Sequence, residues 1–209
     1  MLLTILILTA WVRMTFGMDE SGRLSAPGIG ALKYFTVLSN LLCAAVSLAS
    51  LIHSFLKKDR PYSRLLAHLR LAGTISVMVT FFVVLLFLGP LFGYAGMYAG
   101  ANGIFHLLAP LMSLLDYLLE GEAYPLTPCA RLSCLIPLGL YGTGYLGNLL
   151  LNGVGTWPHT NDFYGFATWG IPAGVGLFAV LGLLTYGFSL SLGWATRFLA
   201  RHCRRHITV

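Results

Sequence analysis

Two polar side chains in otherwise apolar stretches have the chemistry of a nucleophile and its base. Thr36 lies in the apolar run 31–56, and His106 lies in the apolar run 97–119. An imidazole can take the proton of a hydroxyl while the oxygen attacks an acyl carbon, and it can then return that proton to the leaving group. The residue types therefore favour acyl-transfer chemistry, with Thr36 attacking and His106 as the base, if the fold brings the two together.

Each of these residues belongs to a line of polar side chains at helical spacing. In the first run the polar residues recur at steps of three and four, and they are Lys33, Thr36, Asn40, Cys43, Ser47 and Ser50. The second run carries Asn102, His106, Ser113, Asp116 and Glu120. Polar groups that face lipid lose hydrogen bonds worth several kcal/mol. The two lines should therefore face each other or a cavity.

Three further residues are candidates for contacts with a substrate or with an oxyanion. Asn40 lies one turn below Thr36 and could orient its hydroxyl or donate to an oxyanion, whereas Lys33 lies one turn above and could bind a carboxylate headgroup. Asn102 lies about one turn before His106. Asp116 is about 15 Å below His106 on a helix, which is too far for a catalytic triad. The group that orients the imidazole is therefore left unnamed.

Structural roles for the same residues stay open at this point. Threonine hydroxyls in membrane helices usually bond the carbonyl one turn back, and a lone buried histidine usually satisfies a neighbouring helix.

The composition places these residues in a membrane. Hydrophobic residues make up 57% of the 209 residues, charged residues make up 10%, and the mean hydropathy is +0.79, whereas soluble domains carry about 25% charged residues. A crossing needs about 17 to 25 apolar residues. Six runs qualify, so the sequence predicts one all-α, polytopic domain over 1–209, with spans at 2–17, 31–56, 65–92, 97–119, 130–152 and 164–196.

The first and last spans are the least regular of the six. Run 2–17 has neither the basic start nor the cleavage site of a signal peptide, so we interpret it as a retained span. Run 164–196 is long enough to contain a bend around Gly170 and Pro172.

The cations predict the orientation of the chain. Ten of the 13 Lys and Arg residues fall on one side of the predicted topology, namely Lys57, Lys58, Arg60, Arg64, Arg70, Arg131, Arg197, Arg201, Arg204 and Arg205. By the positive-inside rule that side is cytoplasmic, and six spans then return both termini to it. The net charge of +6 is explained in this way, so no nucleic-acid partner is expected.

The outer side holds the predicted substrate entrance. Loop 153–163 should cap it, and we interpret His159 and Asp162 as ordinary loop residues. A cavity below Thr36 and His106 should be apolar, because Phe81, Phe82, Phe87 and Phe105 are available to hold an acyl chain. His53 and His68 lie at the cytoplasmic rim of their predicted spans, which leaves His106 as the one histidine predicted deep in the membrane. One imidazole does not make a metal site. We therefore expect no metal and no cofactor.

One segment and one histidine resemble a known family. The segment Lys33-Tyr34-Phe35-Thr36-Val37-Leu38-Ser39-Asn40-Leu41-Leu42, followed by His106 with Pro110 and Asp116, is similar to the androgen-induced membrane protein family, most of all to its prokaryotic six-span branch. The mammalian members are integral-membrane hydrolases that cleave fatty-acid esters of hydroxy fatty acids with a threonine and a histidine. The resemblance implies Thr36 as nucleophile, His106 as its partner, a lipid or fatty-acyl substrate and a bacterial inner membrane. Ser39-Asn40 stands where the mammalian proteins carry another polar pair, which puts the ester specificity in question before the fold.

Two function classes follow from these observations. The first is an intramembrane hydrolase of lipid-like esters, and the second is a small transporter, channel or ligand-binding receptor that uses the same polar lines. The sequence favours the hydrolase because its two halves show no repeat of the kind that transporters carry. The sequence does not give the oligomeric state.

Overall fold

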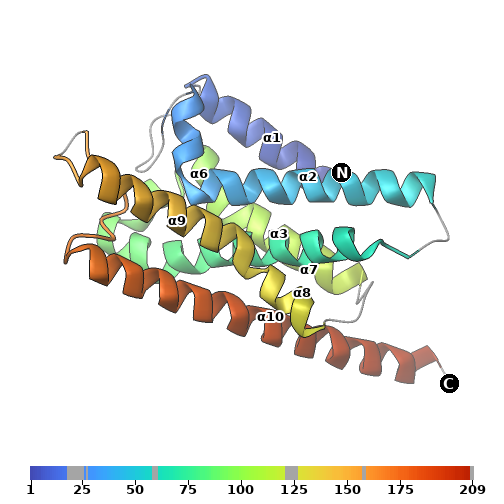
Figure 1. Cartoon of the computed structure of the whole chain (residues 1–209). Coiled ribbons are helices and arrows are strands. Elements are labelled where there is room, and N and C mark those ends of the chain that lie inside the picture. The colour runs from blue at the N-terminus through green and yellow to red at the C-terminus, as the bar shows by residue number, and fades with distance from the viewer. Residues whose placement is uncertain (18–25, 27, 58–60, 121–126, 157–158, 208–209) are drawn as a thin grey trace.

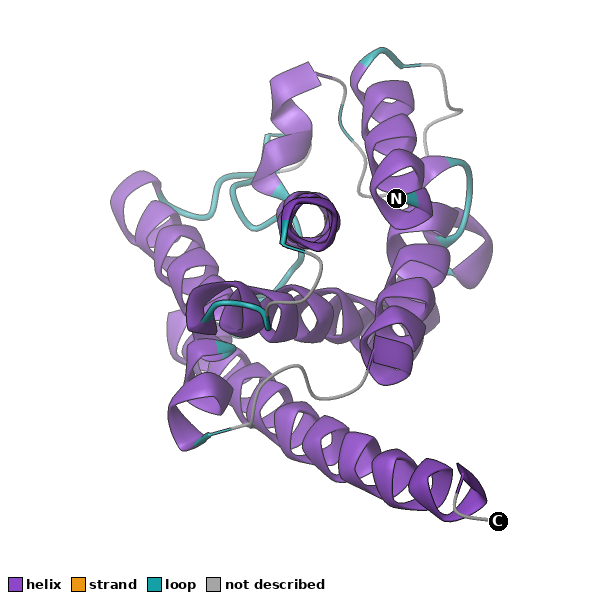
Figure 2. Cartoon of the chain, turned by 90° about the vertical axis from the view of Figure 1, so that its right-hand side faces the viewer, coloured by secondary structure: helices purple, strands orange, loops and turns teal. Residues whose placement is uncertain are grey.

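The computed structural model describes residues 1–209 except 18–25, 27, 58–60, 121–126, 157–158 and 208–209. Every regular element in the described part is helical (Figure 2), as predicted. The elements are α1 (Leu2–Thr15), the 3₁₀ helix η1 (Gly28–Lys33), α2 (Phe35–Leu56), α3 (Arg64–Val83), the π-helix η2 (Val84–Leu88), α4 (Gly89–Phe92), α5 (Tyr94–Met97), α6 (Ala101–Gly103), the π-helix η3 (Ile104–Leu108), α7 (Ala109–Glu120), α8 (Pro128–Ser133), α9 (Leu135–Asn152) and α10 (Ile171–Ile207).

Five helices in the described part are long and apolar enough to cross a membrane. They cover Phe35–Leu56, Arg64–Phe92, Ala101–Leu119, Pro128–Asn152 and Ile171–Leu199. Helix α1 is apolar but has 14 residues, which is about 21 Å at 1.5 Å per residue and less than the roughly 30 Å of a hydrocarbon core.

Two predicted spans begin later than the hydropathy pattern indicates. Helix α2 starts at Phe35, because Tyr34 is extended (φ −89°, ψ 130°) and Lys33 belongs to η1. Lys33 is therefore not on the helical line of Thr36, contrary to the prediction. Helix α10 starts at Ile171, since Gly170 has a φ of +91° and Pro172 suits the first turn of a helix but not its interior. The apolar residues 164–170 thus form turns, and the predicted bend is a helix start.

Helix α3 lies at the centre of the bundle, where it packs against α2, α7, α9 and α10, while α1 packs on α2. The end of α2, α8 and the C-terminus lie at one end of the bundle, and η1, α6 and the loop between α9 and α10 lie at the other (Figure 1). Most of the cations therefore belong to one end of the molecule, as the sequence predicts.

The two polar lines meet, which confirms that the second and fourth predicted spans are neighbours. The Asn40 Nδ2 group donates to the Phe105 carbonyl at 3.2 Å. One turn deeper, Cys43 Sγ donates to Ser113 Oγ at 3.3 Å, and Ser113 Oγ is 3.0 Å from Thr74 Oγ1 of α3. Below Thr36 the lines thus stabilise contacts between helices, which is the usual task of small polar groups in a membrane bundle.

Candidate functional site

Thr36 occupies the first turn of α2 and its side chain is buried. It lines a small cavity of about 30 Å³ together with residues of α3, α9 and α10 and of the loop that precedes α10. That volume is enough to hold a water molecule or one functional group of a ligand. The other polar residues in the lining are Thr80, Tyr141 and Tyr164.

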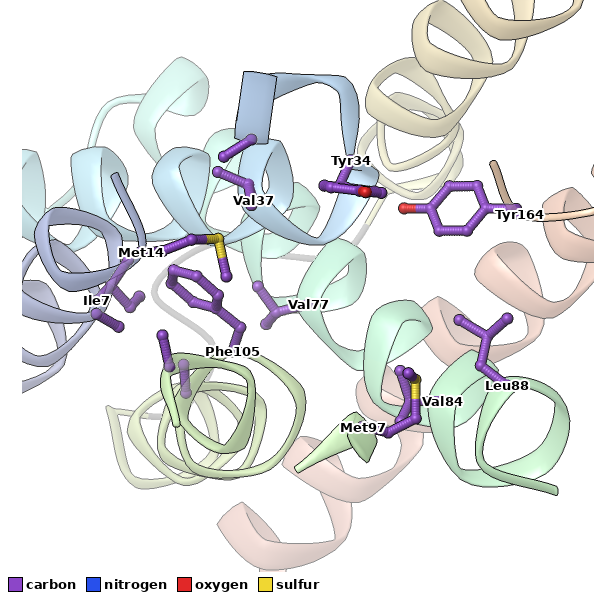
Figure 3. Packing of buried hydrophobic residues seen from close by; sticks show 14 of the residues in the cluster. Ile7, Met14, Tyr34, Val37, Val77, Val84, Leu88, Met97, Phe105 and Tyr164 are labelled. Atoms are coloured by element: carbon purple, nitrogen blue, oxygen red, sulfur yellow. The ribbon is translucent and has the colours of Figure 1, made fainter. Parts of the chain in front are cut away.

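Tyr164 is the site residue that the sequence analysis missed. Its hydroxyl accepts a hydrogen bond from the Phe35 backbone N–H at 3.0 Å, so a loop residue caps one of the N-terminal amides of α2 that have no partner within the helix. Burial raises the pKa of Tyr164 to about 12, and the neighbouring Tyr141 hydroxyl, Phe35 N–H and Thr36 hydroxyl oppose that rise. The phenol is therefore neutral at physiological pH and offers an O–H donor beside Thr36. Figure 3 shows its ring reaching from the loop toward Tyr34.

The loop that carries Tyr164 is held by a buried carboxylate. Asp162 Oδ1 accepts from the Tyr145 hydroxyl at 2.5 Å, and Oδ2 accepts from the Ala167 N–H at 2.9 Å. The expectation that Asp162 is an ordinary loop residue is wrong, because it is buried and bonded to α9. His159 of the same loop is exposed.

His106 lies in the π-helical segment η3 and is buried. Its Nδ1 is 2.5 Å from the Met97 carbonyl oxygen. Since a carbonyl can only accept, Nδ1 carries the proton and Nε2 keeps the lone pair of a neutral imidazole. The Met97 carbonyl is thus the orienting group that the sequence left unnamed. Gly103 allows the backbone before η3 to lie close to Tyr98, because a Cβ there would lie 2.7 Å from the Tyr98 carbonyl oxygen.

Thr36 and His106 are linked through Asn40 and not by a direct hydrogen bond between described atoms. Asn40 Nδ2 donates to the Thr36 carbonyl at 2.8 Å and to the Phe105 carbonyl at 3.2 Å. Both N–H bonds of the amide are used, so Asn40 has no donor left for an oxyanion. Its Oδ1 is buried without a hydrogen-bond partner in the described part of the chain. Asn40 therefore fixes the backbone of Thr36 against the segment that carries His106.

The remaining candidates lie at the edges of this arrangement. Lys33 is exposed at the end of the bundle that carries η1, with its Nζ 5.2 Å from the centre of the Tyr34 ring and 5.1 Å from that of Phe163. Asn102 is buried in α6, before the segment of His106. Asp116 pairs with Arg70 at 3.2 Å, on α7 beyond the turn that carries Ser113. Within the described residues, no three His, Cys, Asp or Glu side chains gather as metal ligands do.

Two apolar hollows adjoin the cavity of Thr36. One, of about 260 Å³, lies between α3 and α10 and shares Val79, Val83, Phe166 and Leu181 with that cavity. The other, of about 520 Å³, lies between α2 and α9 and shares Phe35 and Tyr141 with it.

The predicted phenylalanine lining is partly correct. Phe82 and Phe87 line the hollow between α3 and α10, and Phe81 packs edge-on against Phe82 with ring centres 5.1 Å apart. Phe105 does not line it, because its side chain is fully buried in the core, near Met14 and Val77 (Figure 3).

Comparison with protein-family models, with curated proteins and with solved structures finds no match for this chain.

Proposed function

We propose that the chain is an integral-membrane hydrolase that cleaves lipid-like esters, such as fatty-acid esters of hydroxy fatty acids. The observation that supports this most is the place of Thr36, a buried hydroxyl in a small cavity that shares lining residues with two largely apolar hollows. An ester with two long arms has its reactive carbonyl at such a junction when one arm lies in each hollow.

In this mechanism the Thr36 hydroxyl attacks the acyl carbon and its proton passes to Nε2 of His106. The tetrahedral intermediate collapses with cleavage of the ester C–O bond, and the alcohol leaves with that proton. Water then attacks the acyl-threonine in the reverse sense and releases the fatty acid. The Met97 carbonyl supports this role of His106 because it fixes the proton on Nδ1.

Tyr164 would supply the donor to the oxyanion. Its neutral hydroxyl lies in the lining of the Thr36 cavity, and a fixed O–H donor in a site that excludes water stabilises developing negative charge. Asn40 would hold the nucleophile in register, Lys33 would contact a headgroup, and Asn102 would support the segment of His106.

The proton transfer requires His106 to approach Thr36 when substrate binds. Catalytic hydrogen bonds are often absent in ligand-free enzymes and form in the substrate complex. His106 lies in a π-helical segment, a form that occurs frequently at functional sites and where helix register shifts.

We further propose six spans, with α1 as the first and both termini in the cytoplasm, in a bacterial inner membrane. The gathering of cations at one end of the bundle supports the orientation.

A transporter or ligand-binding receptor is the alternative function. The interruptions of α3 by η2 and of α6–α7 by η3 favour it, since transporters bind substrates at broken helices. Against it, Ser39 bonds Thr80 at 3.2 Å and Cys43 bonds Ser113 at 3.3 Å. These contacts close the space that a permeation path below Thr36 would need, so we favour the hydrolase.

The experiment that tests the proposal is active-site labelling in membranes with a fluorophosphonate probe that carries a long alkyl chain. Wild type should be labelled and Thr36→Ala should not. Thr185→Ala is the matched control, because Thr185 is also a buried threonine (1% exposed, against 9% for Thr36) and donates to the Leu181 carbonyl of its own helix. Labelling of Thr36→Ala at the wild-type level would reject Thr36 as the nucleophile.

A further inference from the structure

The larger hollow is a groove between α2 and α9 with a polarity gradient along its length. The two helices run in opposite directions, so Lys33 of η1 and Asn148 near the end of α9 lie at the same, outer end. The other end is walled by Leu42, Pro137 and Leu140. The α2 wall of the groove, from Phe35 to Leu42, is about 10 Å long at 1.5 Å per residue, and Lys33 lies beyond its outer end. Its volume of about 520 Å³ falls in the range of sites for small molecules.

The groove opens sideways, toward the side that lipid would occupy. Leu38 and Leu140 stand on its two edges and are 39% and 72% exposed. A single alkyl chain can therefore enter from the bilayer without passing through the bundle.

The outer end carries one cation without an acidic partner in the described part of the chain. The Lys33 ammonium is held over the faces of Tyr34 and Phe163 at 5.2 and 5.1 Å, and no described Asp or Glu lies within ion-pair distance of it. Contact with two rings confines the charge to the mouth of the groove. A single ammonium matches a monovalent carboxylate, whereas phosphate sites usually combine several donors or an arginine fork.

We propose that this groove binds one long-chain fatty acid, with the carboxylate on Lys33 Nζ and the alkyl chain along Leu38, Leu42 and Leu140. The inference goes beyond the proposed hydrolysis, because binding of this kind needs neither the Thr36 hydroxyl nor the His106 imidazole. In a hydrolase the same groove would hold the arm that bears the carboxylate.

Gly144 gives a direct way to fill the groove. It lines the groove, and a Cβ built on it meets nothing within 4 Å. Gly144→Leu should therefore occupy the space of the alkyl chain without disturbing the packing, and leucine is a better helix former than glycine. Gly139 of the same helix has equally open surroundings but is not in the lining, so Gly139→Leu is the matched control.

The test uses the full chain in lipid nanodiscs and a palmitate analogue with a diazirine in its alkyl chain. Cross-linked sites are mapped by mass spectrometry, and unlabelled palmitate, hexadecanol and lysophosphatidic acid compete. We expect cross-links on α2 and α9. Lys33→Gln should weaken competition by palmitate about tenfold and leave that by hexadecanol unchanged, and Lys33→Arg should restore it. Gly144→Leu should weaken competition by both palmitate and hexadecanol, whereas Gly139→Leu should change neither.

Three results would overturn the inference. One is cross-linking confined to the hollow between α3 and α10, and another is unchanged binding in both Lys33→Gln and Gly144→Leu. The third is tighter competition by lysophosphatidic acid than by palmitate, which would assign the site to a phosphate headgroup. Repeating the binding experiment with Thr36→Ala separates the two proposals. This variant should not hydrolyse esters, but it should still bind palmitate if the groove inference holds.

Discussion

At the scale of single residues, Thr36 differs from the other buried hydroxyls of the bundle by its hydrogen-bonding environment. Ser50 and Thr185 donate to carbonyls one turn back in their own helices, at 2.9 and 2.7 Å, which is the ordinary structural use of such residues. Thr36 is the second residue of α2, and the residues one turn back, in η1, are not α-helical. Thr36 instead lines a small cavity together with Tyr164.

The two proposed catalytic residues should act as one unit. We expect Thr36→Ala and His106→Ala each to lower ester hydrolysis by about 10³-fold or more, with the double variant no worse than either single variant. Thr36→Ser should keep part of the activity because it retains the hydroxyl. The measurement is turnover of a fatty-acid ester of a hydroxy fatty acid by the purified protein, with Thr185→Ala as control. Full turnover by His106→Ala would exclude the histidine as base.

Tyr164 gives a prediction for alkaline pH. Its pKa is raised by burial from 10.0 to about 12 in the folded chain, so its contribution to stability is complete below pH 10 and is lost as the pH rises through about 12. Thermal unfolding of wild type should therefore become steeply easier between pH 10 and 12, and Tyr164→Phe should flatten this dependence. Identical pH profiles for the two proteins would show that the phenol is solvated.

The residue types of the site were predictable from the sequence, but their surroundings were not. A hydroxyl and an imidazole within apolar runs can be recognised as candidate site residues, because burying polar groups in a membrane costs free energy. Tyr164 cannot be recognised in this way, because tyrosine is common near membrane surfaces. Only the path of the loop in the folded chain brings it to Thr36. The Met97 partner of His106 is a backbone carbonyl, and every residue has one.

At the scale of elements, the hydropathy pattern predicted the long helices well and their interruptions poorly. The expected runs 65–92 and 97–119 correspond to helices over Arg64–Phe92 and Ala101–Leu119. The π-helical segments inside both are not visible in the pattern, since one inserted residue leaves the apolar content unchanged and alters only the phase of the faces. On α9, the two asparagines near the helix end bond each other, since Asn152 Nδ2 donates to Asn148 Oδ1 at 2.7 Å.

In the loop before α10, one buried carboxylate bonds both to α9 and to the loop's own backbone. Asp162 accepts one hydrogen bond from Tyr145 and one from the Ala167 N–H, and bonds to a carboxylate contribute about 1.5–3 kcal/mol each. We expect Asp162→Asn to lower the free energy of unfolding by about 2 kcal/mol and the melting temperature by about 4–8 °C, with reduced labelling of Thr36 as Tyr164 loses its position. His159→Ala, an exposed change in the same loop, should shift neither quantity. An unchanged melting temperature for Asp162→Asn would refute this role of the carboxylate.

At the scale of the whole molecule, the asymmetry of charge and the antiparallel bundle predict which end faces the cytoplasm. Cys129, at the start of α8, is exposed at the cation-rich end. Thr156, in the loop after α9, is exposed at the opposite end. The opposite orientation, with the basic end outside the cell, would violate the positive-inside rule at every loop that carries a cluster of cations.

The topology therefore predicts opposite labelling of two single-cysteine variants in intact cells. One variant keeps Cys129 and has Cys43, Cys134 and Cys203 replaced by alanine, and the other lacks all four and carries Thr156→Cys. A membrane-impermeant maleimide should label Thr156→Cys in intact cells and Cys129 only after permeabilisation. Helix α1 has only 14 residues, so whether it crosses the membrane needs a separate test. Epitope tags at the two ends of the chain provide that test. If α1 crosses with local thinning of the bilayer, both tags are protected, whereas an N-terminal tag accessible from outside would leave five spans and remove α1 from the count.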